Sequence, residues 1–365
     1  MMKKIFVLFL LLIAFSYGFC QPRTQRWPEE KIWKWYNENP WYCGFNYIPA
    51  YAINYTAMWD KTTFNPASID KELALAEKTG MNSLRAVLQY AVYEDDPQYF
   101  LKTLDTFMKL CDKHHIKFIP AFFDDCSFGI KSDPQIGIQP EPLKGWYAWA
   151  WSPSPGHSMV IDQSSHPKLE KYVKAIMGRF KTDKRILFWD LYNEPTNGGL
   201  GSATFPLLKE VIVWASTINP DQPLSIGIFD RNPRLNEIIV DGSDLITFHN
   251  YGNKQVLADQ IRDLQKYNRP IINTEWMNRP FGSTIKDVLS VFYDNKVGCN
   301  LWGLVNGKTQ TELTWGHRPG DPEPKVWQHD LYRGDFKPYD QSEIDLLTET
   351  IKKSKTDEYK KAHQH

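Results

Sequence analysis

The chain has 365 residues, a length that barrels of alternating strands and helices often reach as one domain. Its 43 Lys and Arg residues balance 43 Asp and Glu residues, so the formal net charge is zero and no basic stripe favours nucleic-acid binding. Aromatic residues make up 14% of the chain, and this excess suits a wet, shaped site as well as a packed core.

Residues 1–20 are typical of an export signal. Two lysines precede a short apolar run, Ile5 to Ala14, which is too short for a stable membrane anchor. We therefore expect a signal peptide over 1–20 and a mature domain over 21–365, exported to the periplasm, the cell surface or the medium. A lipid anchor on Cys20 is disfavoured because Phe19 before it is not small. No later stretch is apolar enough for a transmembrane helix, so we expect a soluble mature protein and a monomer.

Apolar runs typical of buried strands then alternate with segments of helical spacing. Strands are predicted at residues 41–46, 82–88, 116–123, 186–194, 223–229, 245–250, 271–274 and 298–304. Helices are predicted at residues 69–78, 99–115, 169–181, 205–217, 232–240, 256–267, 284–295 and 342–353. This alternation predicts an α/β fold with one domain, a parallel (β/α)8 TIM barrel.

A long stretch rich in Pro, Gly and Trp, from Cys126 to about His166, follows the third predicted strand. Trp146, Trp149 and Trp151 lie close together in it. Loops of this length in a compact domain are usually functional, and exposed tryptophans here could stack on the apolar faces of sugar rings. The alternative is a loop that folds back on its own aromatic side chains.

The cysteines after the signal segment are scattered, and none forms a Cys-x-x-Cys pair that would suggest zinc. Cys43 and Cys299 fall on the first and last predicted strands, which are neighbours in a closed barrel. We expect both to be small buried hydrophobic residues rather than disulfide partners.

Two glutamates follow apolar strand runs. Glu194 ends the run I-L-F-W-D-L-Y-N-E before Pro195, and Glu275 follows P-I-I-N-T. The carboxyl ends of barrel strands meet at the rim where barrel enzymes keep their chemistry. Two carboxyl groups facing each other there are what glycoside hydrolysis requires, although a single Asn-Glu-Pro could equally cap a helix. Arg85 lies inside an apolar strand and should therefore meet a carboxylate.

These motifs together resemble a known family. The residues that carry the resemblance, in chain order and at strand ends, are Arg85, Asn193-Glu194-Pro195, His249 with Tyr251, Glu275 and Trp302. The set is similar to clan A of the retaining glycoside hydrolases, above all to the family 5 cellulases and mannanases and related endo-mannosidase-like proteins. One feature departs from the pattern, because Asp124-Asp125 stands where family 5 members usually have a histidine.

The resemblance implies a role for each of these residues. Glu194 would be the acid/base and Glu275 the nucleophile. Arg85 and Tyr251 would lie beside the nucleophile, Asn193 on the sugar 2-hydroxyl, His249 near the acid/base, and Trp302 under the sugar in the first subsite. For His249 the alternative is a structural histidine, and for Trp302 a core position.

Elementary electrostatics agrees with the two glutamate roles. Arg85 and the Tyr251 hydroxyl would keep Glu275 ionised, as a nucleophile requires. Glu194 must keep its proton, so we expect drier, more apolar surroundings for it. No histidine or acidic cluster of obvious ligand spacing joins Asp124 and Asp125, so we expect neither a metal nor another cofactor.

The sequence thus predicts an exported retaining β-glycoside hydrolase that acts on a polysaccharide or oligosaccharide. Two alternatives remain open. One is an exo-acting β-glycosidase of the same clan, which would need a pocket closed at one end. The other is a carbohydrate-binding barrel without catalytic activity, since a fold alone does not establish activity.

Overall fold

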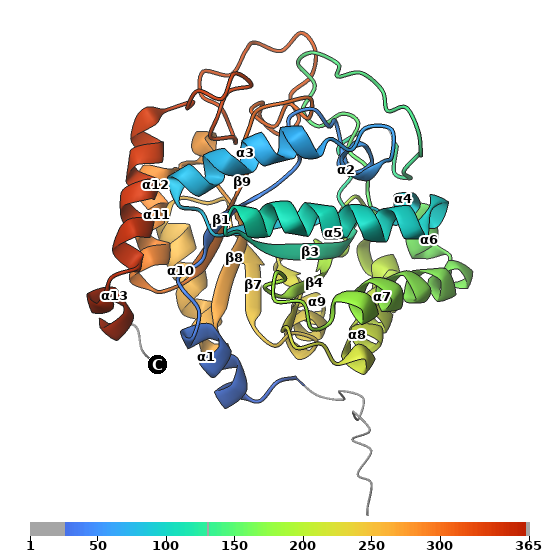
Figure 1. Ribbon diagram of the computed structural model, residues 1–365, viewed down its shortest axis with the longest axis horizontal. Helices are drawn as coiled ribbons and strands as arrows, with labels where there is room; N and C mark the ends of the chain where they lie inside the picture. The colour runs from blue at the N-terminus through green and yellow to red at the C-terminus, as the bar shows by residue number, and fades with distance from the viewer. Residues whose placement is uncertain (1–25, 130, 363–365) are drawn as a thin grey trace, which may run out of the picture.

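A computed structural model describes residues 26–129 and 131–362 (Figure 1). The predicted signal peptide and Cys20 lie outside the described residues. Within these residues, one sheet has nine strands in the order β5-β4-β3-β2-β1-β9-β8-β7-β6, and all its neighbours are parallel. The strands are β1 (Cys43–Asn46), β2 (Ser83–Val87), β3 (Lys117–Asp124), β4 (Trp189–Asn193), β5 (Leu224–Ser225), β6 (Gly227–Ile228), β7 (Ile246–His249), β8 (Ile271–Trp276) and β9 (Gly298–Trp302).

The sheet closes into a barrel through one interrupted strand. β5 pairs with β4 and β6 pairs with β7, and only Ile226 separates β5 from β6 in the chain. Counting β5 and β6 as one strand reduces the nine strands to eight. The predicted (β/α)8 barrel is therefore confirmed.

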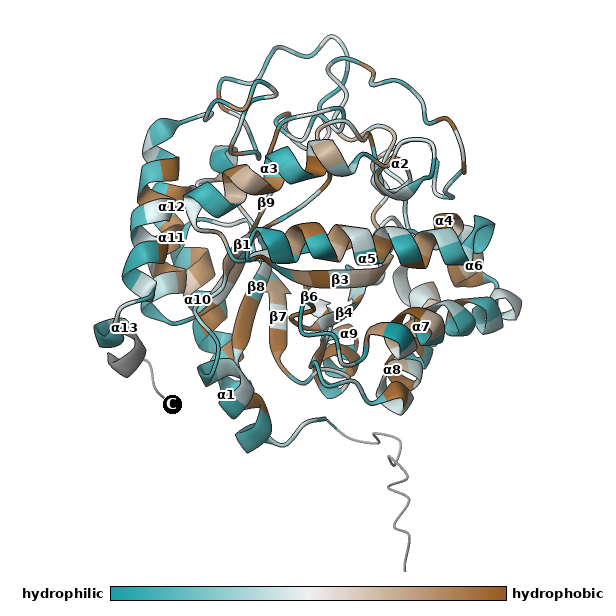
Figure 2. Ribbon diagram, in the orientation of Figure 1, coloured by the Kyte–Doolittle hydropathy of each residue, from teal (hydrophilic) through white to brown (hydrophobic). Residues whose placement is uncertain are grey.

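Helices surround the barrel and turn their apolar faces toward it, as the colouring of Figure 2 shows. The α-helices are α1 (Glu29–Asn37), α2 (Tyr55–Trp59), α3 (Pro66–Thr79), α4 (Tyr90–Asp95), α5 (Pro97–Lys113), α6 (His157–Ile161), α7 (His166–Phe180), α8 (Phe205–Ile218), α9 (Pro233–Asp241), α10 (Lys254–Leu264), α11 (Ile285–Asp294), α12 (Gln341–Ser354) and α13 (Asp357–Ala362). Short 3-10 turns lie at Gln163–Ser165, Gly201–Thr204, Gln265–Tyr267 and Arg279–Phe281.

Several helices begin with the same local chemistry. The Asn65 side chain accepts a hydrogen bond from the Ser68 amide at the start of α3, and Pro66 occupies the first turn, where its missing N–H costs nothing. Asp96 and Pro97 start α5 in the same way, and Asn232 and Pro233 start α9.

Helix α1 was not predicted from the sequence, and it packs at the amino-terminal end of the barrel, at the bottom of Figure 1. Its Ile32 and Tyr36 side chains are buried in a cluster with Tyr42, Ile119 and Leu187. Loops cover the opposite end of the barrel, where the strands finish.

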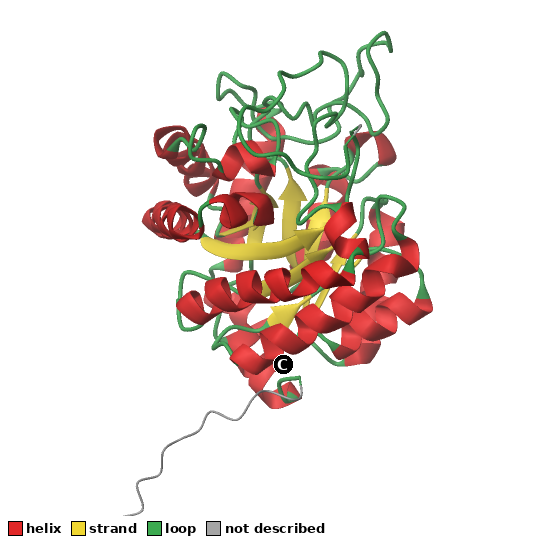
Figure 3. Cartoon of the chain, turned by 90° about the vertical axis from the view of Figure 1, so that its right-hand side faces the viewer, coloured by secondary structure: helices red, strands yellow, loops and turns green. Residues whose placement is uncertain are grey.

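Figure 3 shows long loops gathered beyond the carboxyl ends of the strands. The predicted loop after the third strand is present and contains only the short helix α6 and one 3-10 turn. We call residues 125–156 the β3 loop and residues 303–340 the β9 loop, and the second was not anticipated as a major feature.

Two further predictions concern cysteines and membranes. Cys43 and Cys299 are register partners on β1 and β9, and both are buried and free with their sulfur atoms 3.8 Å apart, as predicted. Among the described residues, no helix combines the length and apolar character needed to cross a membrane.

Candidate active site

Glu194 is the first residue after β4. The strand ends at Asn193, and Glu194 then takes a left-handed backbone conformation with φ of 43°. A non-glycine residue in this region costs on the order of 1–3 kcal/mol and persists only where its surroundings determine it. The turn brings the Glu194 carboxylate to the wall of a pocket at the barrel mouth.

Glu275 lies near the end of β8, where the strand contains a bulge. The register against β7 and against β9 shifts by one residue between Asn273 and Trp276. A bulge redirects side chains that would otherwise alternate regularly, and Glu275 lines the same pocket as Glu194.

The two carboxylates lie close together on either side of His249. One carboxylate oxygen of Glu194, one of Glu275 and a ring nitrogen of His249 all lie within 4.8 Å of one another. Retaining glycosidases hold their two carboxyl groups about 5–5.5 Å apart, whereas inverting enzymes need roughly 6.5–9.5 Å to admit a water molecule. The approach of one oxygen from each carboxylate is therefore close enough for the retaining class.

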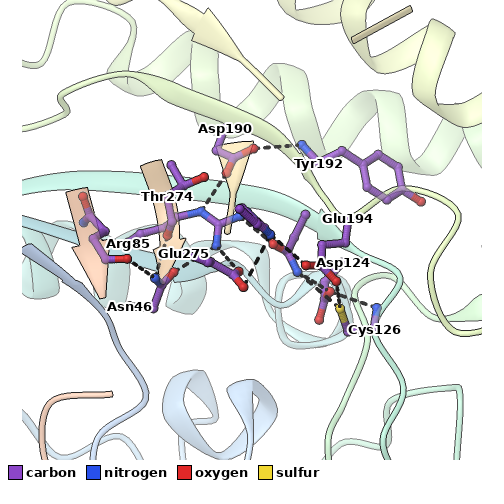
Figure 4. A network of polar contacts seen from close by, with 12 residues as sticks. Asn46, Arg85, Asp124, Cys126, Asp190, Tyr192, Glu194, Thr274 and Glu275 are labelled. Carbon is purple, nitrogen blue, oxygen red and sulfur yellow. Dashed lines mark hydrogen bonds and ion pairs between the residues drawn. The ribbon is translucent and has the colours of Figure 1, made fainter. Parts of the chain in front are cut away.

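Arg85 is the centre of a buried polar network beneath the pocket (Figure 4). It donates hydrogen bonds to Asp190 (2.7 Å), Asn46 (2.9 Å), Glu275 (2.8 Å) and Asn193 (2.6 Å). The expected carboxylate partner of Arg85 is thus present twice, in Asp190 and Glu275. Because four strands contribute to this network, it fixes Glu275 and Asn193 relative to each other.

Both carboxylate oxygens of Glu275 accept a hydrogen bond from a fixed donor. Oε1 accepts from Arg85, and Oε2 accepts from the Tyr251 hydroxyl at 2.7 Å. Tyr251 follows β7, and burial, together with the nearby charge of Glu275, holds its pKa well above the ordinary value, so its hydroxyl remains a donor.

The surroundings of Glu194 are polar, so the expectation of an apolar setting is wrong. Its carboxylate interacts with His249 Nδ1 at 2.7 Å, with the Cys126 thiol at 3.2 Å and with the Asn197 side-chain amide. Burial favours the protonated form, but the hydrogen bond from His249 and those from Cys126 and Asn197 outweigh it and hold the pKa of Glu194 below its ordinary value.

His249 interacts with both glutamates. Its Nδ1 lies 2.7 Å from Glu194 and 3.4 Å from Glu275, and its Nε2 meets no partner among the described residues. A side chain at Gly227 would place its Cβ 3.0 Å from Nε2, so the glycine makes room for the ring.

The predicted tryptophans divide into two groups. Trp302 and Trp151 line the catalytic pocket, which has a volume of about 460 Å³. Trp149 instead lines a second pocket, of about 480 Å³, which also contacts Trp151. Trp146 lies 6.1 Å from the ring of Trp149 and beneath the guanidinium of Arg318 at 4.8 Å, so the loop partly folds on its own aromatic side chains.

Sequence reasoning missed much of the pocket wall. Besides Cys126 and Asn197, the additional lining residues are Phe128, Tyr147, Phe229, Gly252, Phe281 and Trp315. Behind the wall lies His329, whose ring contacts those of Tyr147, Tyr251, Trp302 and Trp315. The partners of Arg85 beneath the pocket were also missed. Of these, Asp190 and Asn46 carried a usable signal, because each is a polar residue inside an apolar strand.

Asp124 and Asp125 have structural partners. Asp124 accepts hydrogen bonds from the side chains of Asn193 (2.8 Å) and Trp151 (2.8 Å), and burial raises its pKa to about 6. Asp125 accepts from Tyr192 (2.7 Å) and Thr204 (2.6 Å), and burial raises its pKa to about 7. Both carboxylates are therefore occupied by hydrogen bonds within the protein and are not free ligands.

Among the described residues, the group close enough to share a metal ion is Glu194, His249 and Glu275. Arg85 places a cationic guanidinium 2.8 Å from Glu275, which opposes a second cation there. The 2.7 Å contact between His249 Nδ1 and Glu194 is an ordinary hydrogen bond. The arrangement fits acid/base chemistry better than metal binding.

Comparison with known proteins agrees with this geometry. The family model described as cellulase (glycosyl hydrolase family 5) matches residues 49–307. Similar solved structures include the endo-1,4-β-mannanase from Rhizomucor miehei, with 13% identity, a TM-score of 0.56, and coverage of 86% of this chain and 95% of that chain. No curated protein sequence matches the chain.

Two further structures are similar in fold. The endo-β-1,4-mannanase from Thermotoga petrophila has 15% identity and a TM-score of 0.57, with coverage of 88% of this chain and 78% of that chain. The exo-β-1,4-mannosidase from Opitutaceae bacterium strain TAV5 has 15% identity and a TM-score of 0.59, with coverage of 86% and 60%. The family match spans most of the barrel, and the chain belongs to glycosyl hydrolase family 5, as a retaining β-glycosidase of the cellulase and mannanase type.

Proposed function

We propose that the protein hydrolyses β-glycosidic bonds in an oligosaccharide or polysaccharide by double displacement, with Glu275 as nucleophile and Glu194 as acid/base. The observation that carries the proposal is the short separation of the two carboxylates, within 4.8 Å, at the wall of one pocket. This proximity favours attack by Glu275 over inversion, in which a water molecule must fit between the two carboxyl groups.

In the first step a Glu275 oxygen attacks the anomeric carbon. A bond forms between Glu275 and the sugar, and the bond from the anomeric carbon to the leaving oxygen breaks, with its electron pair going to that oxygen. Glu194 supplies the proton that the leaving oxygen takes up. Arg85 and Tyr251 keep the attacking carboxylate in position through the hydrogen bonds on its two oxygens.

In the second step water replaces the leaving group. Glu194, now ionised, takes a proton from the water as its oxygen attacks the anomeric carbon. The ester bond breaks and its electron pair returns to Glu275, so the product keeps the starting anomeric configuration.

His249 supports this proton cycle. Its Nδ1 lies 2.7 Å from Glu194, so the ring holds the carboxylate in position as the Glu194 proton moves to the leaving oxygen and is later regained from water.

The pocket favours a neutral sugar. None of the described residues that line it is Lys or Arg, whereas several are aromatic. A sugar carboxylate would meet Glu194 and Glu275 without a cation of its own. We therefore propose a neutral hexose or pentose unit as the substrate.

We also propose that the protein is exported, because the sequence of residues 1–20 has the charge and apolar pattern of a signal peptide. Fractionation of cells that express the full chain should recover it outside the cytoplasm with residues 1–20 removed. Retention of the intact chain in the cytoplasm would contradict this.

The activity test compares wild type with Glu275→Ala on β-linked mannan, glucan, xylan and galactan, and on the corresponding p-nitrophenyl β-glycosides. We expect one sugar class to be cleaved, with the β anomer appearing first by NMR, and a loss of at least about 10³-fold in the variant. Glu275→Gln, which keeps the shape of the side chain, separates binding from catalysis.

Two outcomes would contradict the proposal. A first-formed α product would indicate inversion. Sugar binding without cleavage by wild type, lost in Glu275→Gln, would favour a carbohydrate-binding barrel.

A further inference from the structure

The β3 and β9 loops are joined to each other across one side of the barrel mouth, at the top of Figure 1. Main-chain hydrogen bonds run from Tyr147 to His317 (3.2 Å) and from Ala148 to Thr309 (3.0 Å). The Gln310 side chain accepts from the Gly145 amide (3.0 Å) and donates to the carbonyl groups of Leu143 (2.8 Å) and Trp146 (3.3 Å). We call this set of contacts the loop junction.

The loop junction lies over the ends of β1 and β2. The β9 loop is attached after β1, where the Lys308 amide donates to the Ala50 carbonyl at 3.0 Å. The β3 loop is attached there through Asn54, which donates to the Ala150 carbonyl at 2.8 Å, and after β2 through the Tyr90 amide, which donates to Ser154 at 3.1 Å. Both loops are therefore bound to the barrel rim on this side.

Aromatic rings seal the wall beneath the loop junction. Trp151 from the β3 loop lies 5.7 Å from the ring of Trp302 on β9, 5.4 Å from Phe128 and 5.5 Å from Tyr55 of α2. Its indole N–H is held by buried Asp124 at 2.8 Å. A ring packed on these faces and hydrogen-bonded at its edge is a rigid barrier.

The pocket stops at this wall. Its described lining residues come from β4, β7, β8 and β9, from the segments that follow β4, β6, β7 and β8, and from the β3 and β9 loops. None comes from β1, β2 or the segments that follow them. Among the residues that line the pocket, Phe281, which follows β8, is 60% exposed and Trp315 of the β9 loop is 39% exposed, so the pocket meets solvent beside these two rings.

The positions of the two glutamates determine which part of the substrate lies against this closed side. Glu275 attacks the anomeric carbon, so the sugar that becomes covalently bound lies over β8 and against Trp302 and the sealed wall. Glu194 protonates the leaving oxygen, so the rest of the substrate extends from the β4 side of the pocket.

We infer that the enzyme is exo-acting: the wall formed by Trp151 and Trp302 under the loop junction admits one sugar unit beyond the scissile bond, so single neutral sugars are released from the non-reducing end. This inference rests on the proposed function.

The test uses mannohexaose and cellohexaose labelled at the reducing end, with products separated at low conversion, and the p-nitrophenyl β-glycosides of single sugars. Exo action predicts a labelled pentasaccharide and an unlabelled monosaccharide as the only first products, together with release of p-nitrophenol from at least one single-sugar glycoside. Glu275→Ala serves as the control for contaminating activity.

The failures are distinguishable. First products that include labelled di- or trisaccharides would overturn exo action and leave the proposed hydrolysis intact. Absence of cleavage from every substrate in both panels would overturn the proposed function, and this inference with it.

A matched pair of variants tests the loop junction itself. Gln310→Ala removes its side-chain hydrogen bonds, and Gln341→Ala removes an exposed contact to Asp345 on α12. We expect Gln310→Ala to release a measurable share of disaccharide from the labelled hexasaccharides, while Gln341→Ala retains the wild-type product pattern. An unchanged pattern in Gln310→Ala would contradict the role of the loop junction in closing the pocket.

Discussion

Glu194, the proposed acid/base, is held by donors from three separate parts of the chain. His249 comes from β7, Asn197 from the turn after β4, and Cys126 from the β3 loop. Burial raises the pKa of the Cys126 thiol well above its ordinary value, so the group remains protonated and can donate to Glu194. The same sulfur lies 3.5 Å from the Asn193 amide and 3.4 Å from the Asn197 amide, as an acceptor.

Replacement of Cys126 should shift the pH dependence of activity. Cys126→Ala removes a donor to Glu194 and should raise its pKa, because hydrogen bonds to the charged form lower it. Since the first step needs protonated Glu194, the alkaline limb of kcat/KM should move up by about 0.5–1 pH unit, as expected for one hydrogen bond worth on the order of 1 kcal/mol. Cys126→Ser keeps a donor and should remain near wild type. An unmoved limb in Cys126→Ala would show that the thiol does not tune Glu194.

At this scale the sequence was informative where a residue lies on a strand. Glu194 and Glu275 were predicted correctly at the barrel mouth because the strand pattern determines where a strand ends, and Arg85 was predicted to meet a carboxylate because its burial demands one. Cys126 and Asn197 carried no such signal, since their contacts depend on how loops return to the site. For the same reason the polar surroundings of Glu194 were not anticipated.

One buried arginine, Arg279, joins the end of the β9 loop to the barrel. Arg279, which follows β8, donates to the carbonyl groups of His329 (2.8 Å) and Asp330 (2.9 Å) and pairs with Glu343 of α12 at 2.6 Å. Its guanidinium also lies 4.7 Å from the ring centroid of Tyr339. A planar fork of donors can make these contacts together, whereas an ammonium group cannot.

Arg279→Lys should therefore lower both stability and activity. Loss of the fork leaves buried carbonyl groups unpaired, and we expect a decrease of roughly 2–4 kcal/mol in the free energy of unfolding by urea denaturation. Because Trp315 and His329 belong to the same loop, kcat/KM should fall as well. Arg333→Lys is the matched control, since Arg333 is exposed and its contact with Trp327 suits either cation. Equal effects of the two changes would show that Arg279 does not hold the β9 loop to the barrel.

Among whole elements, those with repeated patterns were predictable and those without were not. The eight strands and the eight helices that follow them were anticipated because burial imposes a regular period. Helix α1 and the β9 loop were missed, because their positions depend on contacts with residues far away in the chain. Tyr36 of α1, for instance, packs in a cluster with Ile119 and Ile272, which belong to β3 and β8.

The whole molecule carries several buried carboxyl groups outside the catalytic pair. Burial raises the pKa of Glu72, Asp125 and Glu312 to about 7, and that of Asp124 and Asp330 to about 6. Each of these groups binds its proton more tightly in the folded than in the unfolded chain. The folded protein is therefore favoured in mildly acidic solution, and its stability should fall as the pH rises toward and through 7.

Glu72 offers the cleanest test of this prediction. It lies on α3, away from the pocket, and accepts hydrogen bonds from the Tyr47 hydroxyl (2.9 Å) and the Ala50 amide (3.1 Å). Its stabilising contribution is complete below the unfolded pKa and is lost as the pH rises through its folded pKa of about 7. In Glu72→Gln the amide oxygen can still accept from Ala50, and the amide group can donate to Tyr47, without a charge to bury.

We therefore expect Glu72→Gln to be close to wild type in the free energy of unfolding at about pH 5, and more stable by roughly 2–4 kcal/mol at about pH 8. Urea denaturation at both pH values measures the difference directly. Glu237→Gln, which changes an exposed glutamate on α9, should follow the wild-type pH dependence. If Glu72→Gln were less stable than wild type at about pH 8, the ionised carboxylate would be stabilising the fold there, and burial would not be the dominant influence on Glu72.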